Sequence, residues 1–187
     1  MKKSLVIDIV EKYLQIFPNE KERLHYLQDY LKTNDEKDIC NWNNADGHIT
    51  AGGFVYSKLT KKFLVMWHKD LKMFLYPGGH TETGDVSPLE RAKIEAKEET
   101  GLQLLNLKLF GDEQIPIDID THKIPFNPRV NMPEHFHFDF RYIFVCQDEN
   151  GVDIDKEEMQ SYKWIDSQEL SKDPNYGNIV KKLKNYL

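Results

Sequence analysis

Three acidic residues near the middle of the chain, Glu95, Glu98 and Glu99, have the spacing of a metal-binding helix face. At about 100° per residue, Glu99 lies roughly 40° from Glu95 on one side and Glu98 roughly 60° on the other. Carboxylates this close repel one another, and a like-charged pair at positions i and i+4 weakens a helix. A hard divalent cation relieves that repulsion, because Mg²⁺ binds carboxylate oxygens together with water and phosphate oxygens. The alternative is a solvated acidic face on a surface helix.

A second group of chemically versatile side chains alternates with aromatic residues over residues 135–142. Alternate side chains of a strand share one face, so His135, His137, Asp139 and Arg141 lie together, opposite four aromatic side chains that should be core. Imidazole and carboxylate groups at this spacing are able to bind a transition metal. The planar guanidinium of Arg141 matches two phosphate oxygens. We predict that this face binds substrate, with a second metal site and a water-exposed strand as the alternatives.

The three glutamates need a helix with defined ends, and the flanking residues predict one over Pro88–Thr100. Ser87 is a favourable N-cap, proline suits the first helical position, and Glu90 completes a Ser-x-x-Glu capping box. Gly101 can adopt the left-handed conformation that ends a helix. The less polar face that should pack on a sheet carries Leu89, Ala92, Ala96 and Thr100.

The rest of the sequence predicts an α+β fold, in which helices cover the faces of a sheet. Short β-rich stretches predict strands at Ile49–Tyr56, Phe63–Trp67, Phe74–Tyr76, Leu102–Phe110, Ile115–Ile119, His135–Cys146 and Tyr162–Ile165. A last helix is expected over Asn175–Tyr186.

The first part of the chain differs from the rest. Apolar residues recur at helical spacing over Leu5–Phe17 and Glu20–Lys32, and an Asn- and Asp-rich loop follows over Thr33–Gly47. We therefore expect residues 1–45 to be an N-terminal helical extension that packs on a main domain of residues 46–187.

Composition narrows the class of protein. Of 187 residues, 40% are hydrophobic and 30% charged, which is typical of a soluble globular domain, and no apolar run approaches the ~20 residues of a membrane span. Two distant cysteines, Cys40 and Cys146, cannot form a disulfide framework, which favours a reducing cytoplasm. The net charge of -6 argues against non-specific nucleic-acid binding. We expect a cytoplasmic protein with no membrane or nucleic-acid partner.

The segment from Gly79 to Leu102 resembles the signature box of the Nudix hydrolase superfamily. In that box a glycine and an acidic residue precede the run Arg-Glu-U-x-Glu-Glu-x-Gly-U, where U is aliphatic. The corresponding run here is Glu95-Ala96-Lys97-Glu98-Glu99-Thr100-Gly101-Leu102. The strand order over residues 48–187 is also similar to that of the family.

The resemblance implies an α/β/α sandwich around a mixed sheet, built from the box helix and a C-terminal helix. It implies Mg²⁺ or Mn²⁺ held by the Gly79 carbonyl, Glu95, Glu98 and Glu99. The implied reaction is hydrolysis of a diphosphate bond by metal-activated water. The implied substrate is a small nucleotide-type molecule, a nucleoside diphosphate linked to another moiety.

Three departures from the family pattern are visible in the sequence. One extra residue lies between Gly79 and the helix, so the first box acid is Asp85 or, with another gap, Glu82. Ile94 replaces the box arginine, and Arg91, one turn before Glu95, is expected to brace the acids instead. The helices of residues 1–45 lie outside the family core, and a homodimer arm is one interpretation of them.

Two alternatives stay open at this point. Some relatives take a further glutamate ligand from a later loop, where Glu157 and Glu158 are the candidates and a solvated turn is the other interpretation. Loss of the box arginine also permits a Nudix fold that binds a nucleotide or sugar phosphate without turnover.

Overall fold

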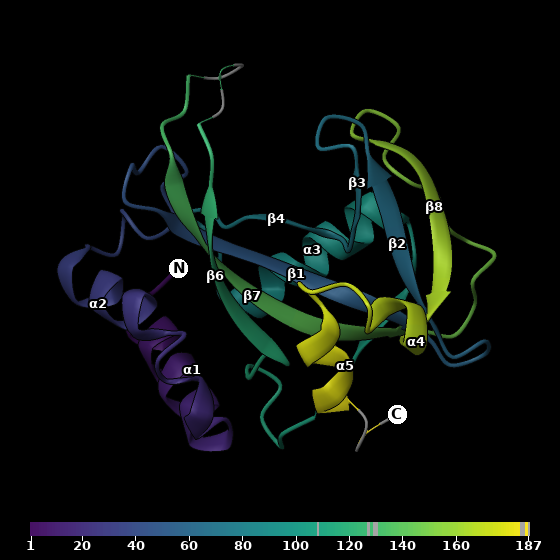
Figure 1. Ribbon diagram of the computed structural model, residues 1–187, viewed down its shortest axis with the longest axis horizontal. Helices are drawn as coiled ribbons and strands as arrows, with labels where there is room; N and C mark the ends of the chain where they lie inside the picture. The colour runs from purple at the N-terminus through teal and green to yellow at the C-terminus, as the bar shows by residue number, and fades with distance from the viewer. Residues whose placement is uncertain (108, 127, 129–130, 184–185, 187) are drawn as a thin grey trace.

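The computed structural model describes residues 1–187 except 108, 127, 129–130, 184–185 and 187 (Figure 1). The strands are β1 (His48–Ser57), β2 (Lys62–His68), β3 (Met73–Leu75), β4 (Gly78–His80), β5 (Leu104–Asn106), β6 (Asp118–Ile124), β7 (His135–Cys146) and β8 (Met159–Asp166). The helices are α1 (Lys3–Ile16), the 3₁₀ turn η1 (Pro18–Glu20), α2 (His25–Thr33), α3 (Pro88–Thr100), α4 (Ser167–Leu170) and α5 (Gly177–Leu183).

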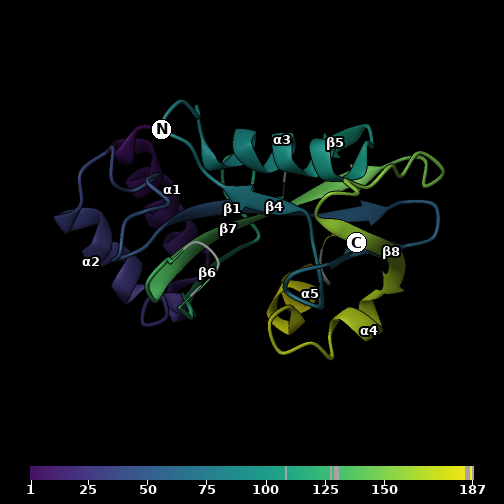
Figure 2. The same ribbon diagram turned by 90° about the horizontal axis from the view of Figure 1, so that it is seen from above.

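The strands form one mixed sheet with helices on both faces, which confirms the predicted fold class. The order is β3-β2-β1-β7-β5, with β4 beside β1, β6 beside β7, and β8 beside β2. The β1–β7 pair is parallel, whereas the other described pairs are antiparallel. Helix α3 covers one face and α5 lies on the other, while α1 and α2 stand at one end of the sheet (Figures 1 and 2).

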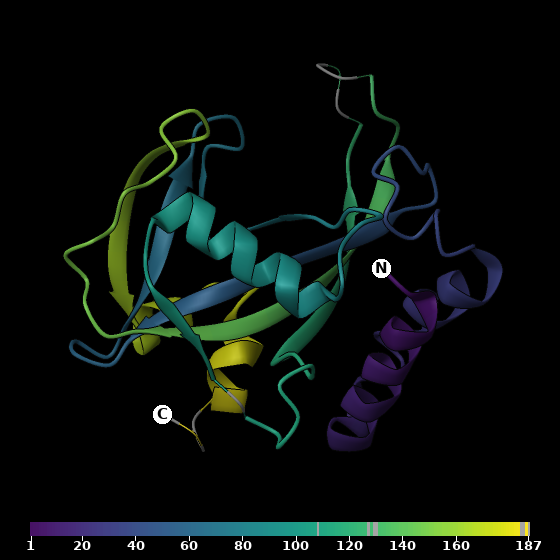
Figure 3. The same cartoon turned by 180° about the vertical axis from the view of Figure 1, so that it is seen from behind.

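Helix α3 has the predicted bounds because both ends are specified by local residues. The Ser87 side chain accepts a hydrogen bond from the Glu90 backbone N–H at 3.2 Å, and Gly101 ends the helix with a φ of 68°. Helix α3 packs on the sheet (Figure 3), and its predicted apolar face is buried. Its buried members are Leu89, Ala92, Ala96 and Thr100, each with 0% exposure.

Strand β4 was not expected, because its Gly-Gly sequence has little β-propensity. It pairs with β1, and a Cβ atom on Gly78 would lie 2.8 Å from the Gly52 Cα. The two backbones approach this closely because neither residue carries a side chain.

Strand β6 differs from the expected strand Ile115–Ile119. It begins at Asp118 and continues to Ile124, while Pro116, which lacks an N–H donor, lies before it. The strand is set by antiparallel pairing with the first half of β7. The strand carries polar side chains and is stabilised by its pairing with β7. A prediction from apolar residues therefore placed it too early in the chain.

Other elements are shorter than expected. The second helix begins at His25 instead of Glu20, because Glu20 belongs to the 3₁₀ turn that Pro18 opens. The expected strand Leu102–Phe110 reduces to β5, and residue 108 lies outside the described residues. The last helix spans Gly177–Leu183, preceded by the unexpected α4; residues 184 and 185 also lie outside the described part.

The N-terminal helices share a hydrophobic core with the sheet. Val6 and Ile9 of α1 and Leu27 of α2 belong to the same buried cluster as Phe138 and Phe140 of β7. The aromatic face predicted for residues 136–142 therefore packs partly against these helices, and only Phe136 in it is half-buried. In the described part of the chain, every helix is too short or too polar to cross a membrane.

Candidate active site

Two of the predicted box acids, Glu95 and Glu99, lie together between helix α3 and strand β4. Glu99 is buried, with 7% exposure, and accepts a hydrogen bond from the Gly78 N–H at 3.2 Å. The Glu95 carboxylate lies against Gly79, where an added Cβ would be 2.7 Å from the Glu95 Cδ. Glu98, by contrast, is exposed at the helix surface. The helix thus brings the predicted residues to one place and buries them to different depths.

The environment of these acids disfavours their negative charge. Burial raises the pKa of Glu99 to about 8, and the charge of Glu95 adds to the effect. Burial also raises the pKa of Glu95, while Arg91 opposes the rise. Two desolvated carboxylates whose charges act on each other form a hard, oxygen-rich donor set that fits a divalent cation.

Arg91 joins the helix to the preceding loop through contacts with three acidic side chains. Its Nε and Nη2 donate to the two Asp85 oxygens at 2.9 and 2.8 Å. Its Nη1 lies 3.4 Å from Glu95 Oε1, and Nη2 lies 3.3 Å from Glu82. Both candidates for the first box acid therefore contact Arg91. Ile94, which stands where the box arginine is expected, is exposed at 40%.

The loop before β8 lies beside the end of α3. The Asp155 N–H donates to the Glu99 carbonyl at 3.3 Å. The charge of Glu158 contributes to the raised pKa of both Glu95 and Glu99. Of the two candidate glutamates in this loop, Glu158 is therefore the one that acts electrostatically on the box acids.

The predicted polar face of β7 lies on the other side of the sheet. Thr50 of β1 donates to Asp139 at 3.1 Å, and Thr50 pairs with His80 in the β1–β4 ladder. Neighbouring strand residues point to opposite faces, so His80 faces the β7 polar side while Gly79 faces α3. The sheet thus separates the box acids from His135, His137, Asp139 and Arg141.

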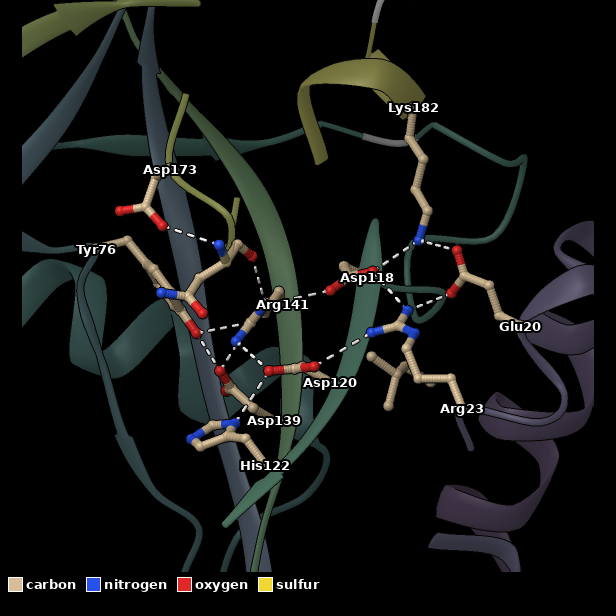
Figure 4. A network of polar contacts seen from close by, with 12 residues as sticks. Glu20, Arg23, Tyr76, Asp118, Asp120, His122, Asp139, Arg141, Asp173 and Lys182 are labelled. Carbon is tan, nitrogen blue, oxygen red and sulfur yellow. Dashed lines mark hydrogen bonds and ion pairs between the residues drawn. The ribbon is translucent and has the colours of Figure 1, made fainter. Parts of the chain in front are cut away.

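Arg141 is buried at 4% exposure, in a network of carboxylates (Figure 4). Its Nε lies 2.9 Å from Asp139, Nη2 lies 2.8 Å from Asp120, and Nη1 lies 3.3 Å from Asp118. Nε also donates to the Tyr76 hydroxyl at 3.0 Å. The fork expected to grip phosphate is instead paired with three aspartates, because β6 places two of them beside β7.

The same network reaches the N-terminal helices and α5 (Figure 4). Asp118 accepts from Arg23 at 2.9 Å and from Lys182 at 2.7 Å. Burial alone would raise the pKa of Asp118, but Lys182, Arg23 and Arg141 lower it overall. Long-range ion pairs therefore tie residues 1–45 to the sheet.

Imidazoles gather where β1, β4 and β7 meet. His135 Nε2 lies 3.2 Å from His137 Nε2. The His48 ring centroid lies 4.6 Å from that of His137 and 4.9 Å from that of His80. His48 pairs with His137 in the parallel ladder, so the two rings share a face.

A groove of about 770 Å³ lies between residues 37–42 and residues 80–84. His80 and Glu82 line it, as does the half-exposed Trp42. Glu82 contacts Arg91, which connects this groove to the box acids. The acids themselves and the β7 polar face are not among its lining residues.

Comparison with known proteins decides the family. Residues 46–185 match the NUDIX domain. The chain belongs to the Nudix superfamily. It is 31% identical over 108 residues to the "Probable DHNTP pyrophosphohydrolase" of Lactococcus lactis subsp. cremoris (strain MG1363), an alignment covering 58% of this chain and 60% of that protein. The chain thus spans less than two thirds of the curated relative that it matches.

Solved structures support the Nudix fold. A NUDIX-family hydrolase from Clostridium perfringens is 28% identical, with a TM-score of 0.51 over 72% of this chain and 93% of that one. A C. elegans Ap4A hydrolase has a TM-score of 0.54 at 19% identity, over 74% of this chain and 96% of that one, which shows a shared fold.

Several residues of this Nudix protein's polar face escaped the sequence prediction. Asp118, Asp120 and His122 alternate along β6 and face the β7 polar residues. Their alternation at every second residue is a strand signal in the sequence. The prediction instead followed the apolar residues Ile115, Ile117 and Ile119, which place the strand closer to the N-terminus. His48 and Tyr76 carry no such local pattern, since only strand pairing brings them to this face.

Proposed function

We propose that this Nudix protein hydrolyses a diphosphate bond in a small nucleotide-type substrate. The observation that carries the proposal is the half-buried Glu95 against Gly79 beside the buried Glu99 on the Gly78 N–H, with Arg91 contacting Glu95. In this proposal Glu95, Glu98, Glu99 and the Gly79 carbonyl hold Mg²⁺ or Mn²⁺. Such a cation, when bound, screens the diphosphate and lowers the pKa of a bound water.

The chain's own residues divide the remaining work. Arg91 orients Glu95 and joins α3 to the preceding loop through Asp85. Glu99, whose pKa is raised to about 8 in the metal-free chain, releases its proton when it binds the cation. Glu98 faces solvent, where its carboxylate is accessible to a cation and to substrate. Glu158 adds a further negative charge from the loop before β8.

The β7 face has a supporting part in this proposal. Arg141 is paired with three aspartates and buried, so it positions Asp139 and Tyr76 instead of gripping phosphate. His137 and His135 lie on the same face of the sheet as Arg141, and they are better candidates than Arg141 for contact with a bound group.

The substrate class rests on the family and on one relative. We infer a nucleoside diphosphate linked to another moiety, with DHNTP as a further candidate because the Lactococcus lactis relative is named for it. The test is a phosphate and pyrophosphate release assay on a panel of nucleoside diphosphate derivatives, nucleoside triphosphates and DHNTP, with Mg²⁺ or Mn²⁺. Release that depends on the cation and is lost in Glu99→Gln supports the proposal.

The second candidate is a nucleotide- or sugar-phosphate-binding module without turnover. The exposed Ile94 in place of the box arginine favours it. Calorimetric binding of a panel compound by wild-type protein, without release of any product, would establish this function and contradict hydrolysis.

A further inference from the structure

Three buried or half-buried histidines converge on the sheet face opposite the box acids. His48, His135 and His137 each place one ligand nitrogen within 4.8 Å of the other two. The parallel β1–β7 register sets His48 beside His137, and the two-residue alternation of β7 adds His135 on the same face. The cluster is thus a consequence of strand pairing, and it is independent of α3.

One member of the cluster lacks any protein partner. His48 has 1% exposure, and neither its Nδ1 nor its Nε2 has a hydrogen-bond partner among the described residues. A buried polar group without a partner costs free energy, so such groups are nearly always satisfied. The site therefore calls for a ligand that the chain itself does not supply.

The Nε2 atoms of the other two histidines face each other. His135 Nδ1 lies 2.8 Å from the Pro133 carbonyl, which only accepts, so this nitrogen carries the proton. The lone pair of neutral His135 is then on Nε2, 3.2 Å from His137 Nε2. A carbonyl that fixes the tautomer of a ligating histidine is a common outer-shell feature of metal sites. Tetrahedral Zn²⁺ with Zn–N bonds of ~2.0–2.1 Å separates its nitrogens by about 3.3 Å.

We propose that His48, His135 and His137 bind a Zn²⁺-class transition metal ion, separate from the box acids. Imidazole nitrogen suits zinc and its neighbours, whereas Mg²⁺ prefers oxygen. His80 borders the cluster, its ring centroid 4.9 Å from that of His48, and it is exposed.

The metal-free alternative is a hydrogen bond from His137 to His135. It would explain their 3.2 Å separation, but it would leave both nitrogens of His48 without a partner. The metal site predicts tight zinc binding in excess Mg²⁺, whereas the hydrogen-bonded arrangement does not. This binding can be measured whether or not the protein is a hydrolase.

The test uses the full chain, stripped with a chelator and titrated with Zn²⁺ against a chromogenic chelator in excess Mg²⁺. We expect one Zn²⁺ per chain, and a Co²⁺ absorption spectrum typical of tetrahedral nitrogen ligation. His48→Ala and His137→Ala should each weaken Zn²⁺ by more than the ~10–100-fold that loss of an outer-shell partner costs. His25→Ala is the matched control, because His25 is 69% exposed and pairs only with Asp29 in the described part of the chain.

Two further measurements keep the outcome decisive. Circular dichroism checks that each variant folds, and His135→Gln replaces any variant that does not. Zinc binding that persists in the histidine variants and disappears in Glu99→Gln would place the ion at the box acids and overturn the proposal. Failure of the wild-type chain to bind Zn²⁺ in excess Mg²⁺ would overturn it as well.

Discussion

Arg91 Nη1 lies 3.4 Å from Glu95 Oε1, one helical turn further along α3. The same guanidinium contacts Asp85 and Glu82 in the loop before the helix. We propose that this cation from within α3 does the bracing that the resemblance assigns to the position of Ile94. This arrangement makes Arg91 a positioning residue for the proposed hydrolysis.

Arg91→Ala is expected to lower kcat for the panel substrate that is turned over. Loss of the brace releases Glu95, and small misplacements of catalytic groups cost about 100-fold in rate. Because the Arg91 side chain is only 12% exposed, we also expect a loss of about 1–3 kcal/mol in the free energy of unfolding. Steady-state kinetics and urea denaturation measure the two effects, and kcat should change more than KM.

Two variants test the specificity of this effect. Lys93→Ala removes a more exposed pair with Glu90 and should leave kcat unchanged. Ile94→Arg in the Arg91→Ala background should restore part of the rate, because it returns a cation to the box position. Wild-type kcat in Arg91→Ala would mean that Glu95 is held in place without the brace.

Metal binding should depend on the carboxylates of α3. Glu98→Gln and Glu99→Gln each replace a charged oxygen ligand with an amide, so we expect each to weaken Mg²⁺ or Mn²⁺ binding by at least about 10-fold. Isothermal titration calorimetry measures the change. Glu90→Gln, on the same helix but paired with Lys93, is the control. Equal affinity in all three variants would remove the proposed site.

The raised pKa of Glu99 predicts how stability depends on pH in the metal-free protein. The folded chain keeps this carboxyl protonated up to about pH 8, whereas the unfolded chain releases the proton near the ordinary value of 4.5. The contribution of Glu99 to the free energy of unfolding is therefore greatest below pH 4.5 and declines as pH rises toward 8.

Chemical denaturation in EDTA across this pH range measures the decline. The expected size is on the order of a few kcal/mol. Glu99→Gln should show a flatter profile, because the amide does not ionise. Cation binding to wild-type protein should also release protons near neutral pH, detectable by calorimetry in buffers of different ionisation enthalpy. Identical profiles for the two proteins would show that Glu99 titrates as an ordinary glutamate.

Arg141 is expected to matter most for stability. Arg141→Ala removes the paired cation of buried Asp139 and one of the three cations around buried Asp118, which should cost about 3–5 kcal/mol in the free energy of unfolding. Arg141→Lys keeps the charge but loses the fork, so its cost should be intermediate. Lys163→Ala, which removes an exposed pair with Glu169, should change stability by less than about 0.5 kcal/mol.

The Arg141 variants also separate two roles. A raised KM in Arg141→Lys with an unchanged melting temperature would instead indicate direct contact with phosphate. Thermal denaturation and kinetics on the same preparations decide between these results.

The sequence by itself determined the features that depend on neighbouring residues. The bounds of α3 follow from Ser87, Pro88 and Gly101, and the buried and acidic faces follow from helical period alone. The period of two along β7 likewise placed its aromatic residues toward the core. These are local relationships, so no knowledge of the rest of the fold was needed.

Only the tertiary structure decided which of these groups meet. The alternation of β7 does not determine that its polar face lies on the side of the sheet away from α3. Nor does it determine that β6 brings Asp118 and Asp120 to Arg141. The parallel register of β1 and β7 places His48 beside His137. Residues paired in this register, such as Thr50 and Asp139, are 89 positions apart in the sequence. Register and face are set by long-range pairing and burial, and a single strand's sequence is compatible with several partners.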